Sequence, residues 1–123
     1  MPNMAKITGY PAYAKYLRAS PSKVRPVADL VRNKPYNEAV DILDHMTQKG
    51  AGLIKKVVVS AASNALNQNR KLGEDMLYVK ELRVDDGPRM RRVWFRARGR
   101  ADMLVKQMCH ISVVVDEISR SEA

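Results

Sequence analysis

The feature that most constrains this chain is a strongly basic segment that lies between two strand-like runs. The segment, residues 87–100, contains six arginines, Trp94 and Phe95, and it has no acidic residue. Apolar side chains recur through residues 76–84 before it and through residues 103–115 after it. A basic segment held between two strands predicts a projecting β-hairpin.

The hairpin is expected to reach well beyond the rest of the chain. If its strands pair through residues 85–106, each leg has about eleven residues and spans ~35 Å at ~3.3 Å per residue. A domain of about 100 residues has a radius of gyration of only ~13 Å. Because an isolated two-stranded ribbon is marginally stable in water, we expect the hairpin to become ordered against a partner.

The composition of the hairpin favours a phosphate-rich partner. A guanidinium group offers a planar fork of N–H donors that matches phosphate oxygens. Trp94 and Phe95 add rings on which a base can stack, at ~1–3 kcal/mol per stacked base. An arginine-rich segment can also be a solvated loop, but two adjacent large aromatics are out of place in a solvated linker.

Length and charge limit the classes of protein to which this chain can belong. The 123 residues suffice for a single domain with one modest core, and the formal net charge of +9 with a pI near 9.9 indicates a polyanion as partner. The apolar runs are too short to span a membrane. We find no secretory signal, and the single cysteine fits a reducing compartment. These features predict a cytoplasmic protein that does not bind membranes.

Apolar periodicity predicts three helices. The first begins near Ser20 and buries Val24, Val27, Ala28 and Val31. Pro26 conflicts with this helix unless Ser22 is its cap, which would put Pro26 at the edge of the first turn. Asn33 is suited to end it in the left-handed conformation. The second and third helices are marked by their apolar stripes: Tyr36, Ala39, Val40, Leu43, Met46, and Ile54, Val57, Val58, Ala61, Ala62, Ala65.

Strict alternation predicts that residues 103–115 form one strand with its apolar face against the helices. That face contains Met103, Val105, Cys109, Ile111, Val113 and Val115. Cys109 is then an inert core residue. His110 points to the opposite face, so the pair cannot act as a Cys–His catalytic site.

Nothing in the sequence indicates an enzyme. Only two histidines are available as bases, and no metal-ligand cluster, nucleophile motif or nucleotide fingerprint is present, so we expect neither metal nor cofactor. Three carboxylates on the second helix, Glu38, Asp41 and Asp44, are more typical of a solvated helix face than of a metal site. Asp85 and Asp86 are expected to hold nearby arginines or to flank the bend at residues 87–88.

Several basic residues outside the hairpin are open to two interpretations. Lys15 and Arg18 accompany three tyrosines in a short strand at residues 10–18, which is either an RNA-facing surface or an ordinary edge strand. Lys23, Arg25 and Arg32 lie off the apolar stripe of the first helix, where they either face solvent or contact RNA.

Four motifs, in order along residues 10–117, carry a family resemblance. The sequences SPSKVRPVADLVR at 20–32, SAASNA at 60–65, RARGRA within 93–102 and HISVVV at 110–115 resemble the helices, hairpin and closing strand of the large-subunit ribosomal protein twenty-two family. The resemblance implies an α+β fold, three helices on a three-stranded antiparallel sheet with a long basic hairpin. It implies one domain over residues 1–123, with a core at about 10–84 and 103–117 and the hairpin at about 85–102.

The resemblance also implies a function. Members of that family are structural proteins of the large ribosomal subunit that bind its RNA, contact neighbouring ribosomal proteins as single copies, and line the nascent polypeptide exit tunnel with the hairpin tip. The candidate RNA-binding residues are Lys15, Arg18, Lys23, Arg25, Arg32, Arg83, Arg89, Arg91, Arg92, Trp94, Phe95, Arg96, Arg98, Arg100 and Lys106.

One departure and one alternative remain at this point. The family often has proline at the position of Phe95, so the shape of the hairpin tip is not fixed by the resemblance. The alternative is a DNA-bending architectural protein, because such proteins also insert basic β-arms into a groove.

Overall fold

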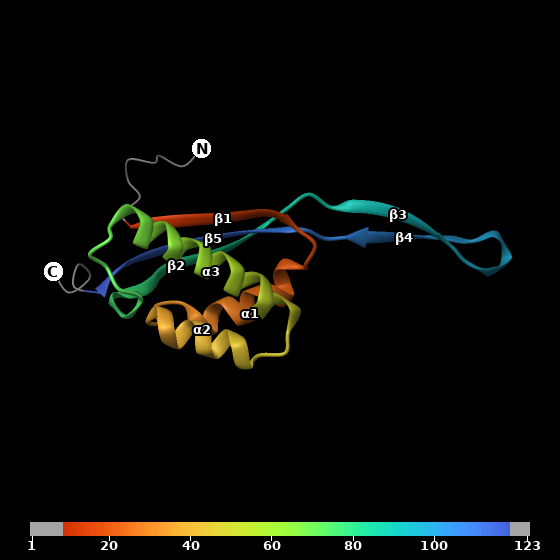
Figure 1. Cartoon of the computed structure of the whole chain (residues 1–123). Coiled ribbons are helices and arrows are strands. Elements are labelled where there is room, and N and C mark those ends of the chain that lie inside the picture. Colours follow the sequence, from red (N-terminus) through yellow and green to blue (C-terminus); the bar gives the residue numbers. More distant parts are fainter. Residues whose placement is uncertain (1–8, 119–123) are drawn as a thin grey trace.

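The computed structural model describes residues 9–118, so the ends of the expected domain, residues 1–8 and 119–123, lie outside the described residues. The body consists of three helices and a three-stranded antiparallel sheet, and a second, two-stranded sheet projects from one end (Figure 1). This is the α+β architecture that the sequence predicted. The described helices are α1 (Pro21–Val31), α2 (Tyr36–His45) and α3 (Lys49–Gln68).

Strand β5 (Cys109–Glu117) is the centre of the body sheet. It pairs on one side with β1 (Tyr10–Leu17) and on the other with β2 (Leu77–Asp86), in the order β1-β5-β2. The four side chains Cys109, Ile111, Val113 and Val115, which alternate along β5, are all fully buried. The predicted alternation is therefore confirmed for this part of the strand.

The helices cover one face of this sheet. Helix α3 packs on β1 and β5, α1 packs on β2 and α3, and α2 packs mainly on α3 (Figure 1). The alanines of α3 are buried, and these small side chains let the helix lie close to the strands. Gly50 at its start is also buried, and it lies close to Val24 of α1. The predicted stripe of α3 is confirmed, although Val57 and Val58 have strand propensity, because burial of the stripe outweighs local preference.

Helix α1 departs from the prediction in one respect. It begins at Pro21 with Ser20 as its N-cap, so Pro26 lies inside the helix and Ser22 is not the cap. Proline has no N–H and leaves the carbonyl of Ser22 without its helical donor. Both residues are exposed, so water can satisfy that carbonyl, while Val24 and Val27 on the opposite side stay buried.

The connection from α1 to α2 closes the free edge of β2. Asn33 takes the expected left-handed conformation, with φ of 65°. Its N–H donates to the carbonyl of Val79 at 3.0 Å, and the N–H of Val79 donates to the carbonyl of Lys34 at 2.9 Å. This segment therefore covers the beginning of β2 as a short extra strand would.

The run predicted as one strand over residues 103–115 is divided at Gln107 and Met108. Residues 101–106 form β4 (Ala101–Lys106), which pairs only with β3 (Met90–Phe95). Met103 and Val105 are therefore exposed and do not pack on the helices as predicted, because the helices do not extend over the hairpin. We call residues 87–108 the arm, and its strands end at a short 3₁₀ turn over Ala97–Gly99.

The arm leaves the body at a close backbone contact. The N–H of Gly87 donates to the carbonyl of Met108 at 2.8 Å, which links the body ladder to the arm ladder. A Cβ atom at Gly87 would lie 3.0 Å from the Met108 carbonyl group. Glycine is thus favoured here, because a Cβ atom would require the Met108 backbone to shift by a few tenths of an ångström.

Burial of Cys109 generates a prediction. The side chain is 0% exposed, and burial raises the pKa of the thiol. Because the thiolate is the reactive form, we expect a water-soluble maleimide to label native protein more than about 100-fold more slowly than guanidinium-unfolded protein. Equal labelling rates in the two states would contradict the buried position.

The raised pKa of the Cys109 thiol also makes stability depend on pH. The stability that the protonated thiol contributes is fully present below the unfolded pKa of about 8.5 and is lost as pH rises above it.

Candidate nucleic-acid interface

The arm is a regular two-stranded ribbon. Register in β3 and β4 runs from Met90 opposite Lys106 to Phe95 opposite Ala101. The ribbon extends away from the helices and from β1, and its tip is far from the core (Figure 1). Every residue from 91 to 103 is exposed. The side chains of the arm are therefore presented to a partner rather than to the body.

The register divides the arm into two faces, because directly opposed residues in an antiparallel ladder share a face. One face is mainly apolar and contains Arg91, Val93, Phe95, Ala101, Met103 and Val105. The other face contains Met90, Arg92, Trp94, Asp102, Leu104 and Lys106. Trp94 and Phe95 project from opposite faces, so the two rings cannot stack on the same base.

The six arginines of the arm differ in what they contact. The Arg96 guanidinium donates to the carboxylate of Asp102, with 2.7 Å between Nε and Oδ2. Arg92 donates to the carbonyl of Arg91 at 3.0 Å. The remaining four side chains have no hydrogen bond or ion pair within residues 9–118, and they are Arg89, Arg91, Arg98 and Arg100.

The tip is a tight turn that the Arg96–Asp102 pair supports. The N–H of Arg96 donates to the carbonyl of Arg100 at 2.7 Å, and Arg98 and Gly99 both have positive φ, 62° and 73°. An arginine in the left-handed region is uncommon and must be held there by its surroundings. Phe95 is an ordinary strand residue opposite Ala101, so the turn starts after this position.

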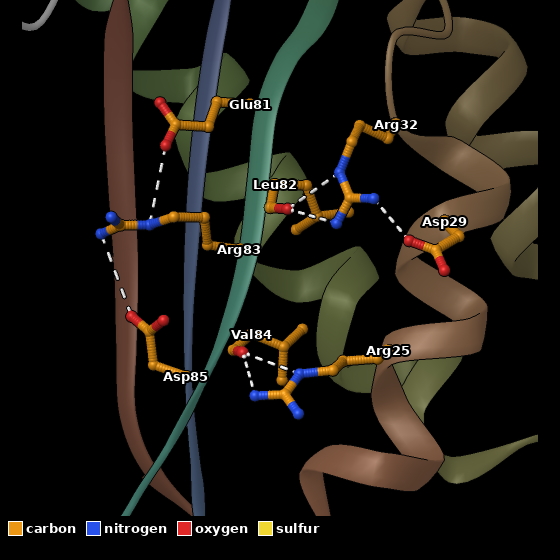
Figure 2. A pocket seen from close by; sticks show the side chains of 8 residues that line it. All are labelled: Arg25, Asp29, Arg32, Glu81, Leu82, Arg83, Val84 and Asp85. Atoms are coloured by element: carbon orange, nitrogen blue, oxygen red, sulfur yellow. Dashed lines mark hydrogen bonds and ion pairs between the residues drawn. The ribbon is translucent and has the colours of Figure 1, made fainter.

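Two of the predicted RNA-binding arginines, Arg25 and Arg32, bind the protein's own backbone. Arg32 donates from Nε and a terminal nitrogen to the carbonyl of Leu82, at 3.1 and 2.8 Å, and Arg25 donates in the same way to Val84 at 3.2 and 3.1 Å (Figure 2). Arg32 is also paired with Asp29, and Arg25 lies 3.4 Å from a carboxylate oxygen of Asp86.

These arginines bind two carbonyls on the outer edge of β2. Strand β2 is at the margin of the sheet, and the carbonyls of Leu82 and Val84 point away from β5 toward α1 (Figure 2). Unpaired edge groups invite pairing with another chain, so a guanidinium on each carbonyl blocks that association.

Carboxylates surround a third body arginine. Arg83 lies 3.6 Å from Glu81 and 3.9 Å from Asp85 on the outer face of β2 (Figure 2). The expectation that Asp85 and Asp86 hold nearby arginines is therefore confirmed.

The other predicted contacts are exposed side chains. Lys15 and Arg18 lie on or just after β1, Lys23 lies on α1 and Lys106 ends β4. Tyr13 and Tyr16 are exposed beside Lys15, while Tyr10 is half-buried. Among the predicted cations of the body, the structure thus separates two groups. Lys15, Arg18 and Lys23 have no ion pair within residues 9–118, whereas Arg25, Arg32 and Arg83 have internal partners.

Asp102 is a site residue that the sequence analysis missed. It lies two residues beyond the segment that was noted for its lack of acids. In the register of β3 and β4 it lies opposite Trp94, which brings its carboxylate to Arg96 at the start of the turn. Only the register made that proximity visible.

Two further observations bear on the type of site. Among residues 9–118 no group of three or more histidine, cysteine, aspartate or glutamate side chains is placed to hold a metal ion. Within the same described range, no helix combines the length and the apolar character that crossing a bilayer requires.

Comparison with known proteins identifies the family. Residues 12–116 match the model of the family described as ribosomal protein L22p/L17e. The proteins named large ribosomal subunit protein uL22 from Treponema denticola and Treponema pallidum are 61% and 50% identical, over 93% and 97% of this chain and 97% and 96% of their own lengths. The Borrelia duttonii protein of that name is 59% identical, over 88% of this chain and 90% of its own. The chain therefore belongs to the ribosomal protein L22p/L17e family.

Proposed function

We propose that this chain is a structural protein of the large ribosomal subunit, that its arm binds the large-subunit RNA, and that the arm tip helps to line the nascent polypeptide exit tunnel. Family membership and the names of its relatives support the first part. The observation that carries the second part is the arm itself, where four arginine side chains that have no partner among the described residues extend beyond the core.

Family membership also bears on the partners of the chain, on its location and on whether it is an enzyme. A large-subunit protein associates with the large-subunit RNA and with other ribosomal proteins, and its place in a bacterium is the ribosome in the cytoplasm. The family is one of structural ribosomal proteins, so the chain is not an enzyme. The DNA-bending alternative has no support among the relatives.

We divide the candidate RNA contacts by whether a carboxylate or the backbone of another element already holds the side chain. The primary contacts proposed are Lys15, Arg18, Lys23, Arg89, Arg91, Arg92, Trp94, Phe95, Arg98, Arg100 and Lys106. Arg96 is proposed to contact RNA while it is held by Asp102. Arg25, Arg32 and Arg83 are secondary contacts, because their first role is to bind backbone or neighbouring carboxylates.

We also propose that the protein acts as a single domain and a single copy. One continuous core lies between the sheet and the helices, and both strands of the arm come from the same chain. Light scattering of the purified protein should give the mass of one chain, and a stable dimer would oppose this part.

The free arginines of the arm generate a binding prediction. Changing Arg89, Arg91, Arg98 and Arg100 together to glutamine should lower the magnitude of the log–log salt slope of binding to large-subunit RNA by roughly 3, at ~0.7–0.9 per phosphate contact. The measurement is filter binding over a series of potassium chloride concentrations. The variant should also leave large subunits during sedimentation through a high-salt gradient in which the unchanged protein stays bound.

The matched control removes the same charge from the body. Lys34, Lys56, Arg70 and Lys71 are exposed, and no ion pair of their side chains occurs within residues 9–118. If their replacement by glutamine reduces the slope as strongly, net charge rather than the arm accounts for binding.

The Arg96–Asp102 pair generates a second prediction. Removing the carboxylate has two effects on the binding of polyanions, and they have opposite signs. Asp102→Asn adds one unit of positive charge, which should strengthen non-specific retention on heparin. Loss of the pair also releases Arg96 and loosens the turn, which should weaken binding to large-subunit RNA about two- to fivefold, as for an exposed ion pair. The exchange Arg96→Asp with Asp102→Arg should restore part of that loss. Tighter binding of Asp102→Asn to both ligands would show that the pair does not organise the tip.

The proposal that the arm tip lines the tunnel can be tested without measuring RNA binding. Arg98→Cys places a thiol at the tip, and the native Cys109 does not interfere because it is buried. On stalled ribosomes we expect a bismaleimide to link this thiol to a cysteine in the nascent chain. Lys56→Cys on α3 is the control and should give no link. Absence of a link from Arg98→Cys at every nascent-chain length would remove the tip from the tunnel wall.

A further inference from the structure

A second basic surface lies where the arm joins the body. A surface cavity of about 610 Å³ is bounded by the turn after β1, by α1, by the start of α3 and by the arm residue Gln107. We call it the root cavity. Its polar lining consists of Arg18, Ser20, Lys23, Gln48, Lys49 and Gln107. Cavities of this size accommodate small-molecule or nucleotide-sized groups.

The charge of the root cavity is unbalanced. Its lining has three cationic side chains and no carboxylate. The cavity between α1 and β2, of about 410 Å³, is the opposite case, because Arg25, Arg32 and Arg83 there are accompanied by Asp29, Glu81 and Asp85 (Figure 2). The body therefore neutralises one group of cations internally and leaves the other group for a partner.

Hydrogen bonding in the root cavity also leaves donors in excess. The Arg18 guanidinium and the Lys23 ammonium have no partner within residues 9–118. Lys49 Nζ donates to the carbonyl of Arg18 at 2.7 Å, which uses one of its three N–H donors. Ser20 Oγ donates to Gln107 Oε1 at 3.3 Å, which occupies the amide oxygen and leaves the amide N–H groups. Such a lining matches an anion with several acceptor oxygens.

The position of the cavity indicates which anion it receives. Gln107 lies in the joint between β4 and β5, next to Lys106 at the base of the arm. A nucleic-acid backbone that followed the arm to the body would therefore meet this cavity at the joint. Lysine binds phosphate as a point charge on a flexible side chain, so it does not need a fixed orientation of the phosphate group. Lys23 and Lys49 can therefore bind a backbone whose path is set by its contacts with the arm.

We infer that the root cavity binds the phosphate backbone of large-subunit RNA at the base of the arm, with Lys23 and Lys49 as its principal contacts. The inference rests on the proposed function and adds a site that is separate from the arm. Lys49 and Gln107 are new to the RNA-binding set, because only the fold brings the start of α3 and the arm joint beside Arg18 and Lys23.

The test replaces the two lysines in the full-length protein. Lys23→Gln with Lys49→Gln should lower the magnitude of the salt slope for large-subunit RNA by roughly 1.5 and weaken binding about tenfold at ~0.15 M salt. The control, Lys56→Gln with Lys71→Gln, removes the same charge from exposed body positions and should change the slope much less. A third variant, Lys23→Arg with Lys49→Arg, keeps the charge and should bind as the unchanged protein does. Thermal unfolding of each variant establishes that the body is intact.

The outcomes separate this inference from the proposed function. If the lysine pair and its control behave alike while the arm variant loses RNA binding, the root cavity is not a phosphate site. The proposed function then stands, without Lys23 among its RNA contacts. If the arm variant also binds RNA normally, both fail. If RNA binding is unchanged and the lysine pair instead loses binding to an acidic neighbouring ribosomal protein, the cavity has a protein partner and the inference is overturned.

Discussion

The pairing of β5 with β2 is the interaction on which the rest of the structure depends. This ladder runs from Leu77 opposite Glu117 to Asp86 opposite Cys109, and the helices pack on its inner face. The Gly87–Met108 hydrogen bond then connects it to the arm. The arm is therefore a continuation of the most buried ladder in the molecule. Because a two-stranded ribbon is marginally stable alone, this connection fixes where the arm starts and in which direction it leaves.

The protein uses arginine for two physically different tasks. On the body, Arg25 and Arg32 donate to the edge carbonyls of β2, where a planar fork of donors can satisfy a backbone acceptor and block strand addition. On the arm, four arginines have no internal partner among the described residues, so their mutual repulsion is relieved only by an external polyanion. The same residue type therefore has a structural role or a proposed RNA-binding role according to what lies within its reach.

Much of the fold could be predicted because burial imposes a period on the sequence. The stripes of α1, α2 and α3, the inward residues of β5 and the positive φ of Asn33 follow from side-chain spacing and local conformational preference. The spacing of apolar side chains could not predict where along the strand the hydrophobic core ends. Met103 and Val105 continue the alternation of β5, yet no helix covers them. Pro26 opposes a helix locally, but the buried valines beside it outweigh that preference.

The sequence by itself determined that the chain has an α+β body, a long basic hairpin and a composition suited to phosphate, and its motifs carried the family resemblance. Only the tertiary structure decided which cations are free. The Arg96–Asp102 ion pair depends on the register of the hairpin. The cavity that joins Arg18, Lys23 and Lys49 depends on packing between residues far apart in the chain. Local sequence records the charge of each side chain, whereas its partner is set by distances that exist only after folding.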